Sequence, residues 1–110
     1  MKRSLCLIML ALAGCESGPG GPPPIARGVT LSSQDGRAWS GRLIERFPAG
    51  TSETDVAARL REEGFVIIPE ANKADFYWSR FPCGHFLGAV WKAVDGKITT
   101  IEGTYGTACT

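Results

Sequence analysis

Apolar residues in the first half of the chain recur at the spacing of an α-helix. One stripe consists of Trp39, Leu43 and Phe47, each four positions after the last. Asp35 can accept backbone N–H groups at the start of such a helix, and Pro48 interrupts it at the other end. We therefore predict a helix over residues 36–47.

A second helical segment follows and carries clearer end signals. Val56 and Leu60 form its apolar stripe. Ser52 can cap its first turn, and Asp55 three residues later gives an approximate capping box. Gly64 follows the last turn, where glycine readily adopts the left-handed conformation that ends helices. The sequence predicts a helix between Ser52 and Gly64.

Beyond Gly64 the apolar residues alternate with a period of two, which is typical of β-strands. Four strands are predicted, over residues 65–68, 75–80, 83–94 and 97–105. Asp95 and Gly96 separate the last two, and an Asp-Gly pair in this position favours a two-residue hairpin. Helices followed by strands predict an α+β domain over residues 25–110. In that domain two N-terminal helices pack on one face of a three- to four-stranded antiparallel meander.

The hairpin turn predicts how the last two strands pair. If Val94 pairs with Lys97, the register continues residue by residue along both strands. It places Phe86 opposite Tyr105, Val90 opposite Ile101, and Trp91 opposite Thr100. Cys83 then faces Ala108, one residue short of Cys109, and a single β-bulge would close that gap.

This register assigns apolar residues to both faces of the sheet. One face carries Leu87, Ala89, Trp91, Ala93 and Ile98. The other face carries Phe86, Gly88, Val90, Lys92, Thr99, Ile101 and Tyr105. Two short helices cannot cover both faces, so we predict partner binding through Phe86, Val90, Ile101 and Tyr105. The alternative is that residues 25–31 or a neighbouring loop close over this second face.

Residues 1–14 have the features of an export signal. Lys2 and Arg3 precede an apolar run over residues 5–13, which is too short to span a bilayer. The run ends in Leu-Ala-Gly-Cys, which resembles the lipobox of bacterial lipoproteins. The resemblance implies cleavage before Cys15 and acylation of that residue, and Glu16 after it favours the outer membrane. The alternative is a buried N-terminal helix.

The segment after the signal predicts a tether. Residues 16–24 are rich in Gly and Pro and hold little that a core could bury, so residues 15–24 connect the lipid to the domain. A composition of 44% hydrophobic and 21% charged residues is typical of a globular protein. The 12 basic and 11 acidic residues nearly balance. Because nucleic-acid binding needs a clustered basic surface, we expect no nucleic-acid partner.

The four cysteines reduce to one pair. Cys6 leaves with the signal and Cys15 carries lipid, which leaves Cys83 and Cys109. In an exported protein such a pair predicts a disulfide bond. The functional alternative is a nucleophilic Cys83 thiol with His85 as its base.

The sequence offers no recognisable catalytic constellation. The chain has one histidine, and no Gly-rich loop joins a strand to a helix. One His and two Cys also lack the paired spacings of a zinc site. We therefore expect no catalytic residue, no metal and no cofactor, and we interpret the protein as a non-enzyme.

The segment from Phe47 to Tyr105 resembles a known family. The similar features are the run Phe-Pro-Ala-Gly-Thr-Ser at 47–52, the Val56 and Leu60 stripe, Gly64 with Phe65, the aromatic strand at 76–78, and the turn at 94–98. They resemble the small outer-membrane lipoproteins of the SmpA/OmlA type, which adopt the fold of β-lactamase-inhibitor-protein repeats. Two features depart from that pattern: the family's glycine-asparagine binding motif is not found, and the pair Cys83 and Cys109 is an addition.

Together these features predict a non-catalytic, lipid-anchored protein facing the periplasm. We expect it to bind the membrane through acyl chains on Cys15 and another envelope protein through its sheet or loops. The resemblance implies a role in outer-membrane assembly or maintenance. The alternative is an inhibitor-like module that fills an enzyme cleft, with Tyr77 or Trp78 as its probe, although both residues also suit a core.

Overall fold

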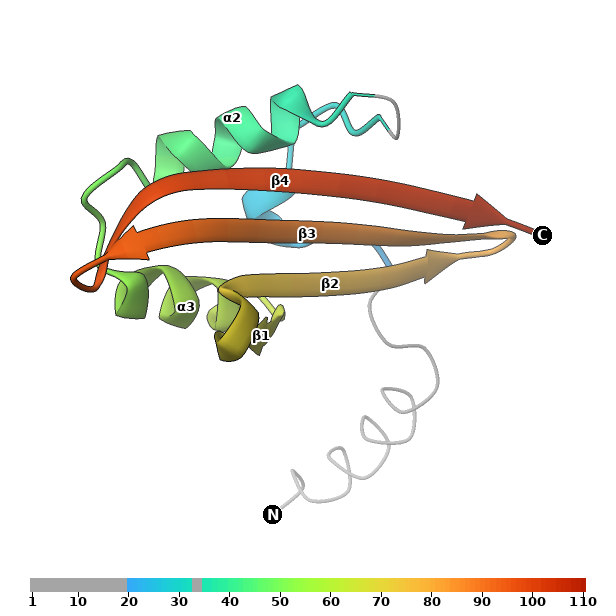
Figure 1. Cartoon of the computed structure of the whole chain (residues 1–110). Helices are drawn as coiled ribbons and strands as arrows, with labels where there is room; N and C mark the ends of the chain where they lie inside the picture. Colours follow the sequence, from blue (N-terminus) through green and yellow to red (C-terminus); the bar gives the residue numbers. More distant parts are fainter. Residues whose placement is uncertain (1–19, 33–34) are drawn as a thin grey trace, which may run out of the picture.

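The computed structural model describes residues 20–32 and 35–110, and it is an α+β domain with two α-helices and one four-stranded antiparallel sheet (Figure 1). The predicted signal and Cys15 lie outside the described residues. In chain order the elements are η1 (Pro24–Ala26), α2 (Arg37–Arg46), α3 (Glu53–Glu62), β1 (Val66–Ile68), η2 (Pro69–Ala71), β2 (Lys73–Arg80), β3 (Cys83–Val94) and β4 (Lys97–Cys109).

Local hydrogen bonds explain where the two helices begin and end. Ser52 Oγ accepts the backbone N–H of Asp55 at 3.3 Å, which caps α3 as predicted. At the other end the backbone N–H of Phe65 donates to the carbonyl oxygen of Leu60, and Gly64 has a φ of +103°. In α2 the cap position belongs to Gly36, while Asp35 Oδ1 accepts the backbone N–H of Arg37 at 2.9 Å.

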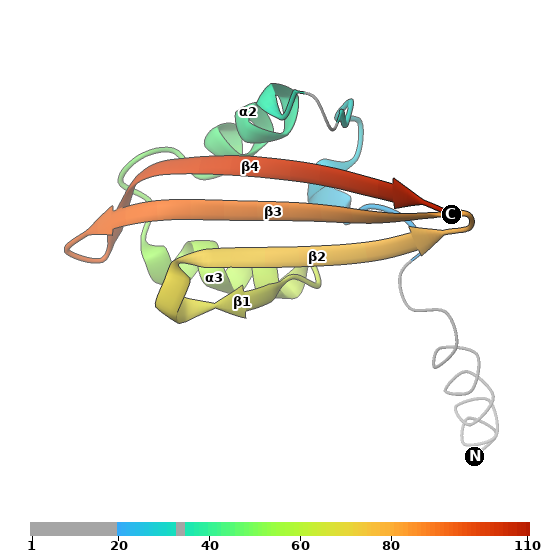
Figure 2. The ribbon, with the colours of Figure 1, turned by 45° about the vertical axis from the view of Figure 1, so that its right-hand side comes forward.

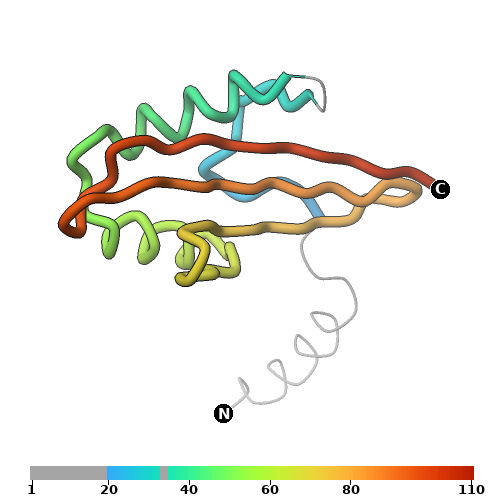
Figure 3. Tube along the Cα trace, viewed as in Figure 1, coloured from blue at the N-terminus to red at the C-terminus, as the bar shows by residue number. Residues whose placement is uncertain are grey.

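The sheet is a simple meander in which each strand pairs with the next, in the order β1, β2, β3, β4. Asp95 and Gly96 both have positive φ, as a two-residue hairpin of the predicted type requires. Strands β2, β3 and β4 run side by side over most of their length, and the tube view shows how they extend well past the helices toward the β2–β3 turn (Figures 2 and 3).

A β-bulge shifts the pairing of β3 with β4, and it corrects the predicted register. Val94 pairs with Lys97 and Ala93 with Ile98, but the register shifts by one residue between Lys92 and Ala93. From that point Lys92 pairs with Thr100, Trp91 with Ile101, Val90 with Glu102, Leu87 with Tyr105 and Phe86 with Gly106. Cys83 therefore faces Cys109, and the two residues form the predicted disulfide.

One hydrophobic core joins both helices to the sheet. Its buried members include Trp39 and Leu43 from α2, Val56 and Leu60 from α3, and Phe76, Leu87, Trp91, Ile98 and Ile101 from the strands. Ile25 and Ala26 belong to the same core, and Pro23 is fully buried. The end of the segment predicted as a tether thus packs with the domain.

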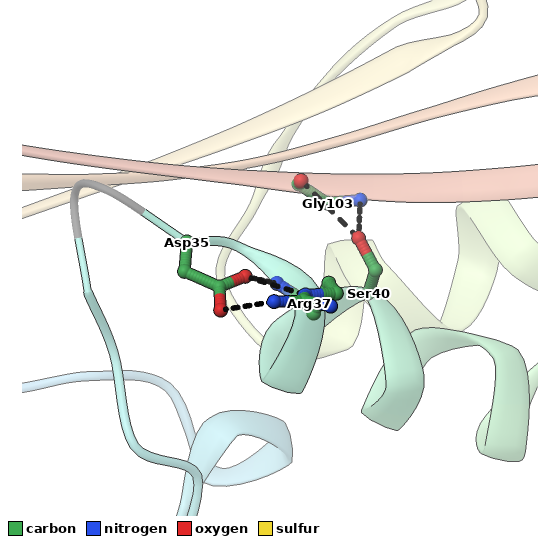
Figure 4. A network of polar contacts seen from close by, with 4 residues as sticks. All are labelled: Asp35, Arg37, Ser40 and Gly103. Carbon is green, nitrogen blue, oxygen red and sulfur yellow. Dashed lines mark hydrogen bonds and ion pairs between the residues drawn. The ribbon is translucent and has the colours of Figure 1, made fainter.

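Two polar contacts stand at the start of α2 (Figure 4). The Ser40 hydroxyl accepts the backbone N–H of Gly103 at 2.8 Å and lies 3.3 Å from the carbonyl oxygen of the same residue. One hydroxyl thereby forms hydrogen bonds with both the N–H and the carbonyl group of Gly103, which do not pair with β3. Asp35 and Arg37 form an exposed ion pair, in which the Arg37 hydrogen bond lowers the pKa of the Asp35 carboxyl.

Trp39 needs a glycine opposite it. Its indole N–H donates to the carbonyl oxygen of Gly88 at 2.9 Å. A Cβ built on Gly103 would collide with the indole ring, so only glycine lets α2 approach β4 this closely. This contact fixes the position of α2 along the sheet.

Candidate functional site

The candidate site is the sheet face whose side chains lie outside the core, which we call the open face. Cross-strand pairing places the following residues on it: Val66, Lys73, Asp75, Tyr77, Phe86, Val90, Lys92, Glu102 and Thr104. Val66 and Tyr77 are 63% and 61% exposed, and Val90 is 39% exposed. Large apolar side chains rarely stay this exposed in a group, which makes the face a candidate interface.

An aromatic pair forms the centre of the open face. The rings of Tyr77 and Phe86 are opposite each other on β2 and β3, with centroids 5.1 Å apart. Phe86 also lies over Gly88, since a Cβ built there would come within 3.0 Å of the ring. A shallow depression of about 360 Å³ adjoins the pair, and Gly84 and Gly106 are part of its lining. Because the neighbouring glycines have no side chains, the rings of Tyr77 and Phe86 project from the surrounding surface.

Charged residues of both signs border this apolar surface. Val90 lies between Lys73 of β2 and Glu102 of β4, which are its two cross-strand neighbours. Lys73 Nζ also lies 3.9 Å from Asp75 Oδ2 on the same strand. An apolar centre with a polar rim is the usual composition of a protein interface.

The structure divides the four predicted contact residues between the two faces. Phe86 and Val90 lie on the open face, as the pairing predicted. Ile101 is 4% exposed in the core and Tyr105 is half-buried against it, so their assignment to the open face was wrong. The bulge is the reason, because a shift of one residue moves every later side chain of β4 to the other face.

Three other expectations concern residues near this face. Trp78 is buried, which confirms the prediction that it suits the core. Tyr77 is exposed, so the same prediction was wrong for Tyr77. Ile25 and Ala26 pack in the core and do not close over Phe86 and Val90. Alternation along β2 could have separated Tyr77 from Trp78, since neighbours on a strand point to opposite faces.

A second cluster lies on the core side of the sheet near the β2–β3 turn. The ring of His85 stacks on Trp78 with centroids 4.8 Å apart, and its Nδ1 lies 2.9 Å from the Tyr105 hydroxyl. Cys83 is in the disulfide and has no thiol, so the alternative of a Cys83 nucleophile with His85 as base was wrong. His85 instead fills a packed aromatic stack.

Residues 20–32 and 35–110 hold no group of three His, Cys, Asp or Glu side chains placed to bind a metal ion. None of their helices has the length and hydropathy of a membrane span. Comparison of the chain with protein-family models, with curated proteins and with solved structures finds no match.

Proposed function

We propose that this protein is a lipid-anchored component of the bacterial cell envelope that binds another envelope protein without catalysis. Acyl chains on Cys15 would hold it at the periplasmic side of the outer membrane, in keeping with its resemblance to small outer-membrane lipoproteins. That resemblance also favours a role in assembly or maintenance of the outer membrane. The open face would be the binding surface.

The arrangement of the helices supports this surface. Stripes from α2 and α3 share one buried cluster with Leu87 and Trp91, so we infer that both helices cover the same face of the sheet. None of the described helices crosses in front of β2, β3 and β4 in the first two views (Figures 1 and 2). Among residues 20–32 and 35–110, no helix therefore keeps a partner from the opposite face.

The observation that carries the proposal is the aromatic pair on the open face. Tyr77 exposes 61% of its surface beside Phe86, at a place where neither ring adds to the core. Aromatic residues at the centre of an interface commonly supply most of its binding energy. Partner binding gives this exposed apolar surface a function that folding does not.

A charge placed in the aromatic pair is expected to prevent partner capture. Phe86→Asp puts a carboxylate at the centre of the proposed interface, and desolvating it there should weaken binding by about 2 kcal/mol or more, roughly thirtyfold. The measurement is affinity capture of partners from detergent-solubilised envelopes with wild-type and variant protein, followed by quantitative mass spectrometry.

Ile44→Asp provides the matched control for this experiment. Ile44 is also an exposed apolar residue, 53% accessible, but it lies on α2 and not on β2 or β3, which carry the aromatic pair. The control should capture the same partner as the wild type. Equal loss of capture in both variants, or none in either, would contradict the proposed surface.

Replacing the acylated residue tests the anchor. We expect Cys15→Ala to leave an unprocessed precursor without lipid, because the thiol is the site of acylation. Intact-mass analysis of envelope material should show a wild-type chain that begins at Cys15 and carries the mass of its acyl chains. A wild-type chain that begins elsewhere, without lipid, would exclude the anchor.

The exposure of Tyr77 favours one second candidate, the inhibitor-like module. A ring that projects from a sheet could enter an enzyme cleft. The capture experiment separates the two: an enzyme partner whose activity falls when this protein binds would support inhibition, and a non-enzyme envelope protein would support the first proposal.

A further inference from the structure

Phe81 is the most exposed of the large apolar residues in the described part of the chain, at 92%. It forms, with Pro82, the two-residue turn between β2 and β3. Turn positions are normally taken by Gly, Asn, Asp or Ser, which water solvates easily. A phenyl ring that is 92% exposed gains little from packing within the domain.

The turn that carries Phe81 is a stiff projection. Strands β2, β3 and β4 run past the ends of both α-helices toward it (Figures 1 and 3). The disulfide between Cys83 and Cys109 links β3 to β4 at the base of the turn. Thr110 reinforces this link, because its backbone N–H donates to the carbonyl oxygen of Pro82 at 2.9 Å. The ring is thus held away from the domain on a cross-linked end of the sheet.

The charges around the turn suit a lipid surface. Within residues 79–84 and 106–110, which form this end of the sheet, Arg80 is the single charged side chain. An arginine beside an exposed aromatic ring can place its guanidinium among lipid phosphates while the ring enters the acyl region. The opposite end of the sheet instead carries Asp95 and Lys97.

The proposed anchor would lie on the same side of the molecule. In both ribbon views the described chain begins on the side of the β2–β3 turn and away from the turn at Asp95 and Gly96 (Figures 1 and 2). Cys15 precedes Gly20 by five residues, which reach about 17 Å at most. A lipid on Cys15 would therefore hold this end of the sheet close to the bilayer.

We propose that the turn at Phe81 and Pro82 is a membrane contact, in which the Phe81 ring inserts into the lipid interface. This inference rests on the proposed lipid anchor of Cys15. The turn and the acylated N-terminus then form two attachment points that fix the orientation of the domain. The long axis of the sheet stands up from the bilayer, and the open face turns sideways toward neighbouring proteins.

Fluorescence quenching tests this contact. The lipidated Phe81→Trp variant is reconstituted into vesicles of phosphatidylethanolamine and phosphatidylglycerol with brominated acyl chains. Val94→Trp is the matched control, because Val94 is 62% exposed at the other end of the sheet. Wild-type protein supplies the background of the buried Trp39, Trp78 and Trp91. We expect the indole at position 81 to be quenched at least about twofold more strongly than the one at position 94.

Flotation of the same samples tests the membrane contact of Phe81 separately from the lipid anchor on Cys15. Protein that floats with the vesicles, while the indoles at positions 81 and 94 are quenched equally, overturns the membrane contact and leaves the anchor in place. Wild-type protein that carries no lipid and does not float overturns both. Both substituted positions are exposed, so neither variant is expected to disturb folding.

Discussion

Trp91→Asp is expected to abolish the cooperative unfolding transition. Trp91 is 4% exposed and packs in the core, where its indole N–H donates to Glu53 Oε2 at 3.2 Å. Truncation of a buried tryptophan costs about 3–5 kcal/mol, and the new carboxylate is buried beside that of Glu53. Because a small domain has a free energy of unfolding of only about 5–10 kcal/mol, little folded protein should remain. Thermal melts followed by circular dichroism measure this loss.

Two variants control for the size and position of the change. Trp91→Phe keeps most of the buried ring and should retain a cooperative melt, with a loss of about 1–2 kcal/mol. Phe86→Asp introduces the same charge on the opposite face of the same strand, β3, and should unfold cooperatively near the wild-type temperature. If Phe86→Asp is the variant that loses its transition, the two faces of the sheet are assigned the wrong way round.

Reduction of the disulfide is expected to destabilise the domain without unfolding it at room temperature. Cys83 and Cys109 are 26 residues apart, and closing a loop of this length stabilises the folded state by about 3.5 kcal/mol in the chain-entropy model. For a domain of this size that corresponds to a Tm lower by roughly 15–25 °C. Calorimetry of the oxidised protein and of the Cys83→Ser, Cys109→Ser double variant measures the difference.

Local amide exchange separates this effect from a general loss of stability. The core around Trp91 and Ile101 should keep its order of protection, while the ends of β3 and β4 near the missing bond exchange fastest. Thiol labelling of denatured, non-reduced protein from the periplasm should find neither Cys83 nor Cys109 free. Two free thiols in that sample would contradict a disulfide in the cell.

Features that depend on a few adjacent residues could be predicted from the amino-acid sequence. The cap at Ser52, the left-handed Gly64 and the hairpin turn at Asp95 and Gly96 each follow from the conformational preferences of one or two side chains. Such preferences act whatever the rest of the chain does, so the ends of α2 were predicted to within one residue and β3 over its whole length. In contrast, β2 begins two residues earlier and β4 ends four residues later than predicted. The disulfide could be predicted because the proposed export signal and the strand pairing both indicated it.

The position of the bulge depends on tertiary contacts. The turn pairs Val94 with Lys97, and the disulfide pairs Cys83 with Cys109 at the far end of the same two strands. These two pairs differ in register by one residue, so β4 must accommodate one extra residue between them. The loop before α3 determines the place, because Gly50 donates to the carbonyl oxygen of Ile98 and Ile98 donates to that of Thr51. These contacts join residues far apart in the chain, and no local pattern encodes them.

The position of the bulge determines which residues of β4 lie on the open face. With the bulge placed before Ile101, Ile101 and Tyr105 turn toward the core and Glu102 and Thr104 take their places outside. The face of Phe86 and Val90 was predicted correctly because alternation along β3 alone sets it, whereas the face of the later β4 residues depends on the bulge. The elements and their order could therefore be predicted from the sequence, whereas long-range hydrogen bonds determine which side chains of β4 are exposed on the open face.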